Sequence, residues 1–364
     1  MAELFDDFAS LVLRRRPLID LRAPVEFARG AFPGAVNLPL MNDEERRLVG
    51  IRYKERGNEE ALKLGHELVS GAVKEARVAA WCRFVERNPD ALLYCFRGGQ
   101  RSQIAQRWMA EAGCKIARLK GGYKALRRFL IDRTAASVER FLPLVLGGRT
   151  GSGKTALLKT FPNGVDLEGL ANHRGSSFGR KITPQPTQID FENGLAYDLI
   201  GKLHHGFYRL LFEDEGRNVG RLYLPEPLVR HLDTAPLVIL ETPMRERVRI
   251  TFEEYVVRAR REYAASGVND WRRAWREDIV KAIDRIRRRL GSERHGIVSK
   301  MVADACEAER KGAPVEVHET WVAYLLKEYY DPMYDYQIAK RSHRIVFRGD
   351  AEAVRAYLQE SLKV

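Results

Sequence analysis

Short apolar runs alternate along the first part of the chain with charged segments of helical periodicity. The apolar runs predict strands, or turns leading into strands, at 17–20, 31–38, 90–94 and 115–119. Between them, residues 42–87 are charged with Leu, Val and Ala at helical spacing, which predicts two or three helices. A further helix is expected over 102–112, because Gly113 suits the left-handed conformation of a helix end.

The alternation continues in the second part, after a charged helix expected over 123–140. Strands are predicted at 141–146, 208–212, 237–240 and 344–347, with an arginine-rich helical stretch at 245–312. Strands alternating with helices in both parts predict an α/β fold of two domains with mostly parallel sheets. We expect these domains at 1–135, with a helical insertion at about 42–87, and at 141–364, with a basic helical segment at about 245–330.

Composition narrows the class of protein. A chain of 364 residues suits two domains, and no run approaches the ~18 apolar residues of a membrane helix. The acidic start of the sequence lacks the features of a signal peptide. Four cysteines at wide spacings give neither a metal quartet nor a disulfide framework. These features predict a cytoplasmic protein with reduced thiols and no membrane partner.

The charge balance adds one clue about partners. Lys and Arg number 62 against 49 Asp and Glu, a net charge of +13. A polyanion such as nucleic acid is a natural partner for such a surface, although a soluble basic protein without that partner fits equally well.

A glycine-rich loop follows the strand at 141–146. Its sequence is Gly148-Arg149-Thr150-Gly151-Ser152-Gly153-Lys154-Thr155, which satisfies the phosphate-binding pattern G-x-x-x-x-G-K-[ST]. The glycines let backbone N–H groups surround a diphosphate, Lys154 adds a positive charge, and Thr155 is a candidate Mg²⁺ ligand. The second Mg²⁺ ligand is expected at a strand end, where Glu213-Asp214-Glu215 competes with Glu241. We favour the first cluster, with Asp214 as the ligand.

A second loop carries a cysteine between a strand and a helix. The segment is Tyr94-Cys95-Phe96-Arg97-Gly98-Gly99-Gln100-Arg101-Ser102. The glycines let the loop wrap around the sulfur, and Arg97, Arg101 and the helix dipole favour the thiolate. Cys95 is therefore predicted to be a catalytic nucleophile. Three other cysteines lack such surroundings and are predicted to be inert, namely Cys82, Cys114 and Cys306.

The first part of the chain resembles the rhodanese domain. The resemblance rests on residues 19–22, 26–27, 30–39, the Cys95 loop and 119–123, and the insertion at 42–87 exceeds a minimal rhodanese. It implies that Cys95 carries sulfur or selenium as a persulfide or perselenide. Cys95 and Arg101 also fit the C-x5-R pattern of cysteine phosphatases, so a rhodanese-fold phosphatase or sulfurtransferase is one alternative.

A rhodanese-like domain followed by a phosphate-binding loop domain resembles the tRNA 2-selenouridine synthase family over essentially the whole chain. Further matching segments are 49–54, 170–179, 185–188, 191–193, 213–215 and 219–220. The resemblance implies that wobble 2-thiouridine in the tRNA anticodon is S-geranylated by geranyl diphosphate. Selenium from selenophosphate then displaces the geranyl thiol, and a selenophosphate-supplying enzyme is a possible partner. We interpret the phosphate-binding loop as the site of the diphosphate and Cys95 as the site of selenium transfer.

The resemblance also suggests residues that contact tRNA. They are His173, Arg174, Gly175, Ser176, Phe178, Gln185, Gln188 and Glu213, together with Arg285 and Arg288 of the basic helical segment. Arginines on phosphates and aromatic rings under bases are common devices in RNA binding. The competing interpretation is a solvated arginine face and, for Trp271 and Trp275, an ordinary core.

Two other classes of function stay open from the residues alone. The segment 237–247 resembles a nucleotide-kinase strand followed by a basic helix, so a kinase or NTPase with a regulatory rhodanese domain is possible. A tRNA-binding module without catalysis is the third alternative. ATP turnover would favour the kinase, and full retention of activity and binding after Cys95→Ser would favour the binding module.

Overall fold

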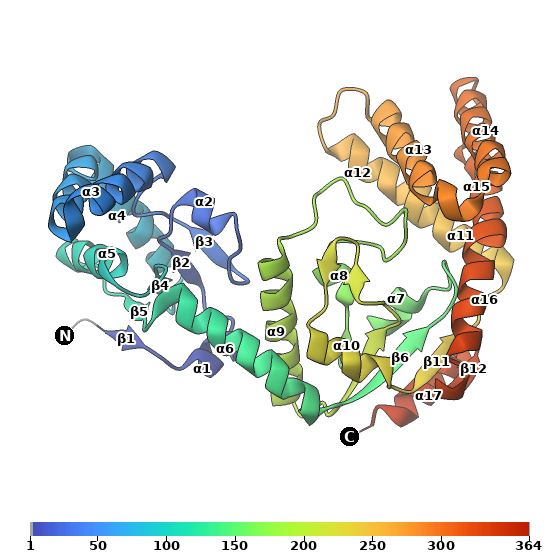
Figure 1. The fold of residues 1–364 in the computed structure, drawn as a ribbon, viewed down its shortest axis with the longest axis horizontal. Coiled ribbons are helices and arrows are strands. Elements are labelled where there is room, and N and C mark those ends of the chain that lie inside the picture. Colours follow the sequence, from blue (N-terminus) through green and yellow to red (C-terminus); the bar gives the residue numbers. More distant parts are fainter. Residues whose placement is uncertain (1–2, 364) are drawn as a thin grey trace. The chain divides into compact units, whose positions relative to one another are not determined.

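The computed structural model describes residues 3–363 and divides the chain into two compact units (Figure 1). The first unit combines the chain up to Ser137 with residues Thr187–His205, and the second combines Val138–Pro186 with the chain from Gly206 onward. The order of the motifs along the sequence did not predict that residues 187–205 join the first unit. Within residues 3–363 no helix is both long and apolar enough to cross a membrane.

The first unit is built on a five-stranded parallel sheet with the order β1-β5-β4-β2-β3. Its strands are β1 (Leu4–Phe5), β2 (Leu18–Asp20), β3 (Ala35–Asn37), β4 (Leu92–Tyr94) and β5 (Ala117–Leu119). Its helices are α1 (Phe8–Leu13), α2 (Pro24–Phe27), α3 (Asp43–Leu68), α4 (Gly71–Arg87), α5 (Gln100–Glu111), α6 (Gly122–Ser137) and α9 (Gln188–His204). The four predicted strands are confirmed, and the helical insertion at 42–87 corresponds to α3 and α4.

Local chemistry explains where α3 begins. The side chain of Asn42 accepts a hydrogen bond from the Glu45 backbone N–H at 2.8 Å, and Glu45 accepts one from the Asn42 N–H at 2.8 Å. This reciprocal pair satisfies two N–H groups that a helix start otherwise leaves unpaired. Strand β4 is apolar and fully buried, as expected for a strand covered on both faces.

The second unit has its own five-stranded parallel sheet with the order β12-β11-β6-β8-β7. Its strands are β6 (Leu142–Gly147), β7 (Gly164–Val165), β8 (Arg209–Glu213), β11 (Leu237–Leu240) and β12 (Ile345–Gly349). The helices around the sheet are α7 (Lys154–Leu158), α8 (Leu167–Leu170), α10 (Glu226–Asp233) and α17 (Ala351–Ser361). A small antiparallel pair, β9 (Asn218–Val219) and β10 (Leu222–Tyr223), completes the strands. The strands predicted here from the apolar runs are confirmed.

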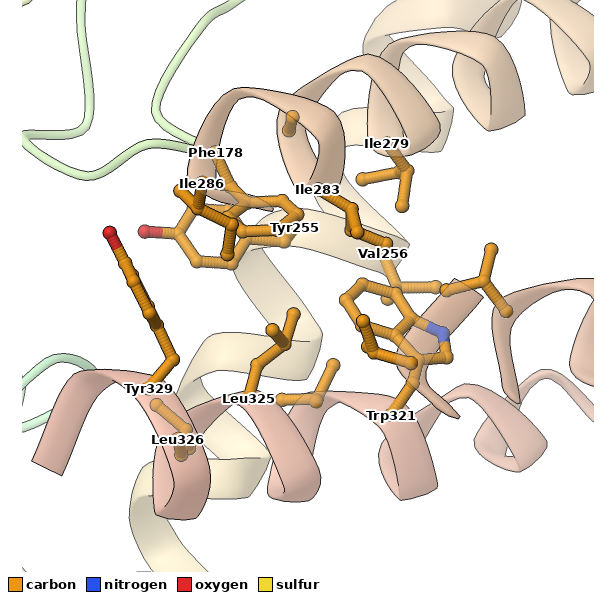
Figure 2. Close-up of a cluster of buried hydrophobic side chains, with 14 of the residues drawn as sticks. Phe178, Tyr255, Val256, Ile279, Ile283, Ile286, Trp321, Leu325, Leu326 and Tyr329 are labelled. Carbon is orange, nitrogen blue, oxygen red and sulfur yellow. The ribbon is translucent and has the colours of Figure 1, made fainter. Parts of the chain in front are cut away.

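A helical segment follows β11, as the arginine-rich stretch predicted. It contains α11 (Met244–Phe252), α12 (Ala259–Ala265), α13 (Trp271–Leu290), α14 (Ser292–Arg310), α15 (Glu319–Leu325) and α16 (Asp331–Lys340). Its apolar faces enclose a separate core, in which Tyr255, Ile283 and Trp321 lie together (Figure 2). Trp275 is buried in the same core, which agrees with its structural interpretation, whereas Trp271 is only half-buried and lies outside it.

Helix α9 is anchored in the first unit by polar and steric contacts. The Ala31 N–H donates to Asp190 at 2.7 Å, and the Asn193 side chain donates to the Ala31 carbonyl at 2.6 Å. Gly30 has φ +142°, and a Cβ added there would lie 2.5 Å from the Cβ of Ile189. The close approach of α9 therefore requires glycine at position 30.

We expect Gly30→Ala to destabilise the first unit by about 1–3 kcal/mol, because the added methyl group would overlap Ile189. Urea unfolding followed by circular dichroism measures the loss. Gly34→Ala is the matched control, since Gly34 also has a positive φ, +76°, but no atom within 4 Å of an added Cβ. Equal losses in the two variants would show that α9 packing contributes nothing to the cost.

Candidate active site

The Cys95 loop connects β4 to α5 and packs against the turn before α6. The Tyr123 N–H donates to the Cys95 carbonyl at 2.9 Å, and Arg118 donates to the Gly98 carbonyl at 2.7 Å. Gly122 has φ +60°, and a Cβ there would lie 2.3 Å from the Cys95 carbonyl oxygen. Glycine at this position is thus needed for the loop to sit where it does.

The sulfur of Cys95 lies at the base of this loop, and the residue is only 3% exposed. Its Sγ is 3.4 Å from the Ser102 hydroxyl. The N–H groups of residues 96–99 donate to no acceptor among residues 3–363, and α5 begins directly after them. Unpaired N–H groups at a helix N-terminus favour bound anions. The loop can therefore stabilise negative charge on or near the sulfur.

The two arginines predicted beside Cys95 differ in their surroundings. Arg101 is engaged by Glu26 at 2.6 Å, and Arg46 contacts the same carboxylate at 3.2 Å. Burial opposes the charge of Glu26, but the hydrogen bond from Arg101 outweighs it and lowers the pKa of Glu26. Arg97 is exposed and forms no ion pair within the described chain. Arg97 is therefore the one available to an incoming anion, and the catalytic roles of both arginines stay predictions.

A largely apolar cavity of about 670 Å³ lies beside α5 in the first unit. Its apolar walls come mainly from α3 and α5, with Leu40, Met41, Val49, Ile51, Leu62, Ile104 and Trp108 among them. Four Lys and Arg side chains, Arg46, Arg47, Lys54 and Arg101, line it as well. The sequence revealed the long insertion that supplies α3, but nothing in its spacing indicated a cavity.

The phosphate-binding loop joins β6 to α7 in the second unit. The N–H groups of Thr150, Gly151 and Gly153 donate to no acceptor within residues 3–363, which leaves them for a phosphate group. Arg247, only 2% exposed, donates to the Thr150 carbonyl at 2.9 Å and pairs with Asp331 at 2.5 Å. Arg247 thus fixes the loop from behind, a role that sequence reasoning missed because its only signal was a generally basic helix.

Three carboxylates surround the lysine of this loop. Burial opposes the positive charge of Lys154, but Tyr334, Glu168 and Glu215 outweigh it and raise the pKa of the ammonium group. Burial, reinforced by the charge of Glu168, raises the pKa of Glu213 to about 7. The same causes place the pKa of Glu215 well above its usual range. Perturbed groups of this kind are concentrated at functional sites. Glu168 was not predicted, since nothing in its local sequence marks it.

The hydrogen-bond partners of the candidate carboxylates indicate which of them could bind Mg²⁺. Both oxygens of Asp214 accept hydrogen bonds from Arg341, at 2.5 and 2.7 Å, while Glu241 is 54% exposed and pairs with Arg348. Glu213 is 1% exposed, and its Oε1 has no partner among the described residues. The described chain holds no cluster of three or more metal-ligating side chains. Thr155 and Glu213 are therefore the residues that would hold Mg²⁺, with other ligands from a diphosphate and water.

The residues predicted to contact tRNA separate into distinct places. His173, Gly175, Ser176, Gln185 and Arg285 line one polar cavity of the second unit. Phe178 is buried in the helical core, and Arg174 is buried in an ion pair with Glu262 at 2.7 Å. Gln188 belongs to α9 of the first unit, and Arg288 is exposed on α13. The polar cavity is thus where most of these predictions converge.

The buried carboxylate of Glu213 predicts a pH-dependent effect on stability. Its pKa is raised from 4.5 to about 7, so the folded protein binds this proton more tightly than the unfolded chain. The contribution of Glu213 to the free energy of unfolding of the wild-type protein therefore falls as the pH rises from 4.5 to about 7. Relative to wild type, we expect Glu213→Gln to gain up to about 3 kcal/mol between pH 4.5 and 7 and no more above it. Urea unfolding at several pH values measures this difference in the free energy of unfolding. Glu241→Gln, at an exposed position, is the control and should show no such pH-dependent gain. Parallel pH curves for the two variants would contradict the prediction.

Comparison with known proteins identifies a family for each of the two domains. The family model described as the tRNA 2-selenouridine synthase AAA domain matches residues 142–364, and the rhodanese-like domain model matches residues 4–128. A tRNA 2-selenouridine synthase from Sulfurovum sp. is 62% identical over 97% of both chains. Proteins of the same name from Hydrogenovibrio crunogenus and Marinobacter nauticus are 51% and 49% identical, over 98% and 96% of this chain and 98% and 95% of theirs. The chain therefore belongs to the tRNA 2-selenouridine synthase family.

Proposed function

We propose that this enzyme converts wobble 2-thiouridine of tRNA to 2-selenouridine through an S-geranylated intermediate, in the cytoplasm. Geranyl diphosphate and selenophosphate are the co-substrates, the latter from a separate selenophosphate-supplying enzyme. The observation that carries the two-step route is the apolar cavity of about 670 Å³ beside α5. Neither an unmodified thiouridine nor selenophosphate has an apolar chain to occupy it, whereas a geranyl group does.

The first step belongs to the phosphate-binding loop. The thiocarbonyl sulfur attacks the first carbon of geranyl diphosphate, a sulfur–carbon bond forms, and the carbon–oxygen bond breaks to release diphosphate. The N3 proton of the alkylated base is lost to water. Lys154 and the unpaired N–H groups of Gly151 and Gly153 stabilise the negative charge that develops on the leaving group. Mg²⁺ held by Thr155 and Glu213 would add positive charge at the same place.

The second step belongs to the Cys95 loop. The Cys95 thiolate attacks C2 of the S-geranylated uridine, and geranyl thiolate leaves. The selenium of selenophosphate then attacks C2 and releases the Cys95 thiolate. Hydrolysis of the selenium–phosphorus bond then yields 2-selenouridine and phosphate. The unpaired N–H groups of residues 96–99 and exposed Arg97 suit the anionic selenium donor, while Cys95 is the nucleophile assigned to selenium transfer.

The division of labour predicts opposite effects of two substitutions. We expect Cys95→Ser to block selenation and to leave S-geranylation largely intact. Lys154→Ala should slow geranylation by about 10²-fold or more, because it removes the charge that stabilises the diphosphate. The readout is mass spectrometry of nucleosides after incubation with 2-thiouridine anticodon stem-loop RNA, geranyl diphosphate and selenophosphate.

Cys114→Ser is the control, since burial and its contact with Cys82 raise the pKa of the Cys114 thiol to about 12 and keep it unreactive. If Cys95→Ser abolished both reactions in a folded protein, the division between the loops would be wrong. If the wild-type enzyme left 2-thiouridine unchanged although it bound the RNA, the whole proposed function would fail.

The apolar cavity predicts a dependence on the length of the S-alkyl chain. Leu62 lines the cavity from α3, so Leu62→Trp fills space that we assign to the geranyl group. We expect the variant to raise the KM for S-geranylated RNA in selenation by about tenfold, since a few buried methylene groups carry that much binding energy. Steady-state selenation of S-geranylated and S-ethylated stem-loops measures the effect.

The short S-ethyl substrate and Leu62→Met separate cavity filling from general damage. Leucine and methionine have similar volumes, so Leu62→Met should retain the preference for the long chain. Leu62→Trp should react with the S-ethyl substrate as wild type does. An equal loss on both substrates would exclude this cavity as the site of the geranyl group.

A further inference from the structure

A second cavity, of about 610 Å³, lies in the second unit and has the opposite character. It is lined by polar side chains of the 173–185 loop, the β9–β10 turn and α13. Four of the lining residues are cations, namely Arg180, Lys181, Arg221 and Arg285, and none of the lining residues is acidic. Neither the phosphate-binding loop nor the Cys95 loop contributes to it.

The four cations are not neutralised within the described chain. Arg285 donates to the Ser177 carbonyl at 2.9 Å and Arg221 to the Gln185 carbonyl at 2.8 Å, so both are held by uncharged acceptors. Arg180, which is exposed, and Lys181, which is half-buried, form no ion pair with any residue of 3–363. Burial, followed by the charge of Arg174, lowers the pKa of Lys181, although Glu262 and Asp166 act in the opposite direction. Burial, followed by the charge of Arg180, lowers the pKa of Arg285, although Asp278 acts in the opposite direction.

The walls of the cavity are rigidly built. The Gln185 amide donates to the carbonyls of Ala171 and Val219, each at 3.0 Å, and accepts from the Arg221 N–H at 2.9 Å. A Cβ at Gly220, where φ is +62°, would lie 2.3 Å from the Gln185 side-chain oxygen. The loop, the β9–β10 turn and their cations are therefore held in place before any ligand arrives.

His173 adds a neutral donor to the same wall. Its Nδ1 accepts the Gly175 N–H at 3.1 Å, which leaves the proton on Nε2. Burial, with the charge of Arg180, lowers the pKa of His173 to about 4, so the ring is neutral at physiological pH. A neutral N–H donor among fixed cations suits an anionic oxygen ligand.

We propose that this cavity binds phosphodiester groups of the tRNA backbone, at a site separate from the phosphate-binding loop. The proposal rests on the proposed function for the identity of the RNA. An anion that enters the cavity reduces the repulsion among the cations. RNA phosphates supply such negative charge. The site also adjoins two of the carboxylates around Lys154, because a Cβ on its lining residue Gly175 would lie 2.2 Å from Glu168 and 2.6 Å from Glu215.

The arrangement of charge favours a polymer over a single small phosphate. The cations stand on three separate elements around a space much larger than one phosphate ion. Along α13, Lys281, Arg285 and Arg288 are spaced four and three residues apart and share one face of the helix. Lys281 and Arg288 are exposed and form no ion pair among residues 3–363, so the positive track extends beyond the cavity. A row of phosphates matches such a track.

The test is the salt dependence of tRNA binding by the full chain. Fluorescence anisotropy with a labelled 2-thiouridine tRNA, over a series of KCl concentrations, gives the slope of log Kd against log salt. We expect Lys181→Gln and Arg285→Gln each to weaken binding and to reduce that slope by about 1, as the loss of one phosphate contact does. Arg230→Gln, at an exposed position of α10, removes one charge from the same unit outside the cavity and should leave the slope unchanged.

Three results would overturn the proposal. An unchanged slope in both cavity variants would show that no RNA phosphate lies in the cavity. An equal fall of the slope in Arg230→Gln would show that the loss of net charge alone causes the effect. Weaker retention of geranyl diphosphate or inorganic phosphate with unaltered tRNA binding would assign the cavity to a small phosphate ligand. Formation of selenouridine by wild-type enzyme, measured separately by nucleoside mass spectrometry, tests the proposed function independently of these outcomes.

Discussion

Both sites depend on one constraint of parallel sheets, that strands deliver their carboxyl ends to a common edge. At this edge of the first unit's sheet, β4 runs through the Cys95 loop into α5. At the corresponding edge of the second unit's own sheet, β6 runs through the phosphate-binding loop into α7. Each loop leaves several N–H groups without acceptors among the described residues, because the chain turns sharply from strand to helix. Both loops therefore present unpaired backbone N–H groups that an anionic ligand could accept.

Buried charge is arranged in two opposite ways in the second unit. Around Lys154, three carboxylates crowd one ammonium group, and their pKa values rise because burial and mutual repulsion disfavour so much negative charge. Across Gly175, the polar cavity gathers cations with no carboxylate among its lining residues. Separating the two signs costs stability in the free protein, and ligands of complementary charge would offset that cost on binding.

The sequence predicted what local patterns determine and missed what distant contacts determine. The strands, the insertion and the phosphate-binding loop follow from periodicity and spacing, and the structure contains them. Arg247 was not predicted, since it lies 97 residues from the carbonyl that it holds. The choice between Glu213 and Asp214 depends on which way adjacent side chains point at the end of β8, and no sequence pattern fixes that direction.

The position of α9 has a consequence for synthesis on the ribosome. The first unit includes residues up to His205, so its last helix is made only after the phosphate-binding loop has emerged. The usual order, in which an N-terminal domain folds before the next begins, is therefore unavailable to this chain. Until α9 has been synthesised, the surface of Gly30 and Ala31 that contacts this helix stays uncovered. A nascent chain stalled before residue 188 would expose that surface to chaperones.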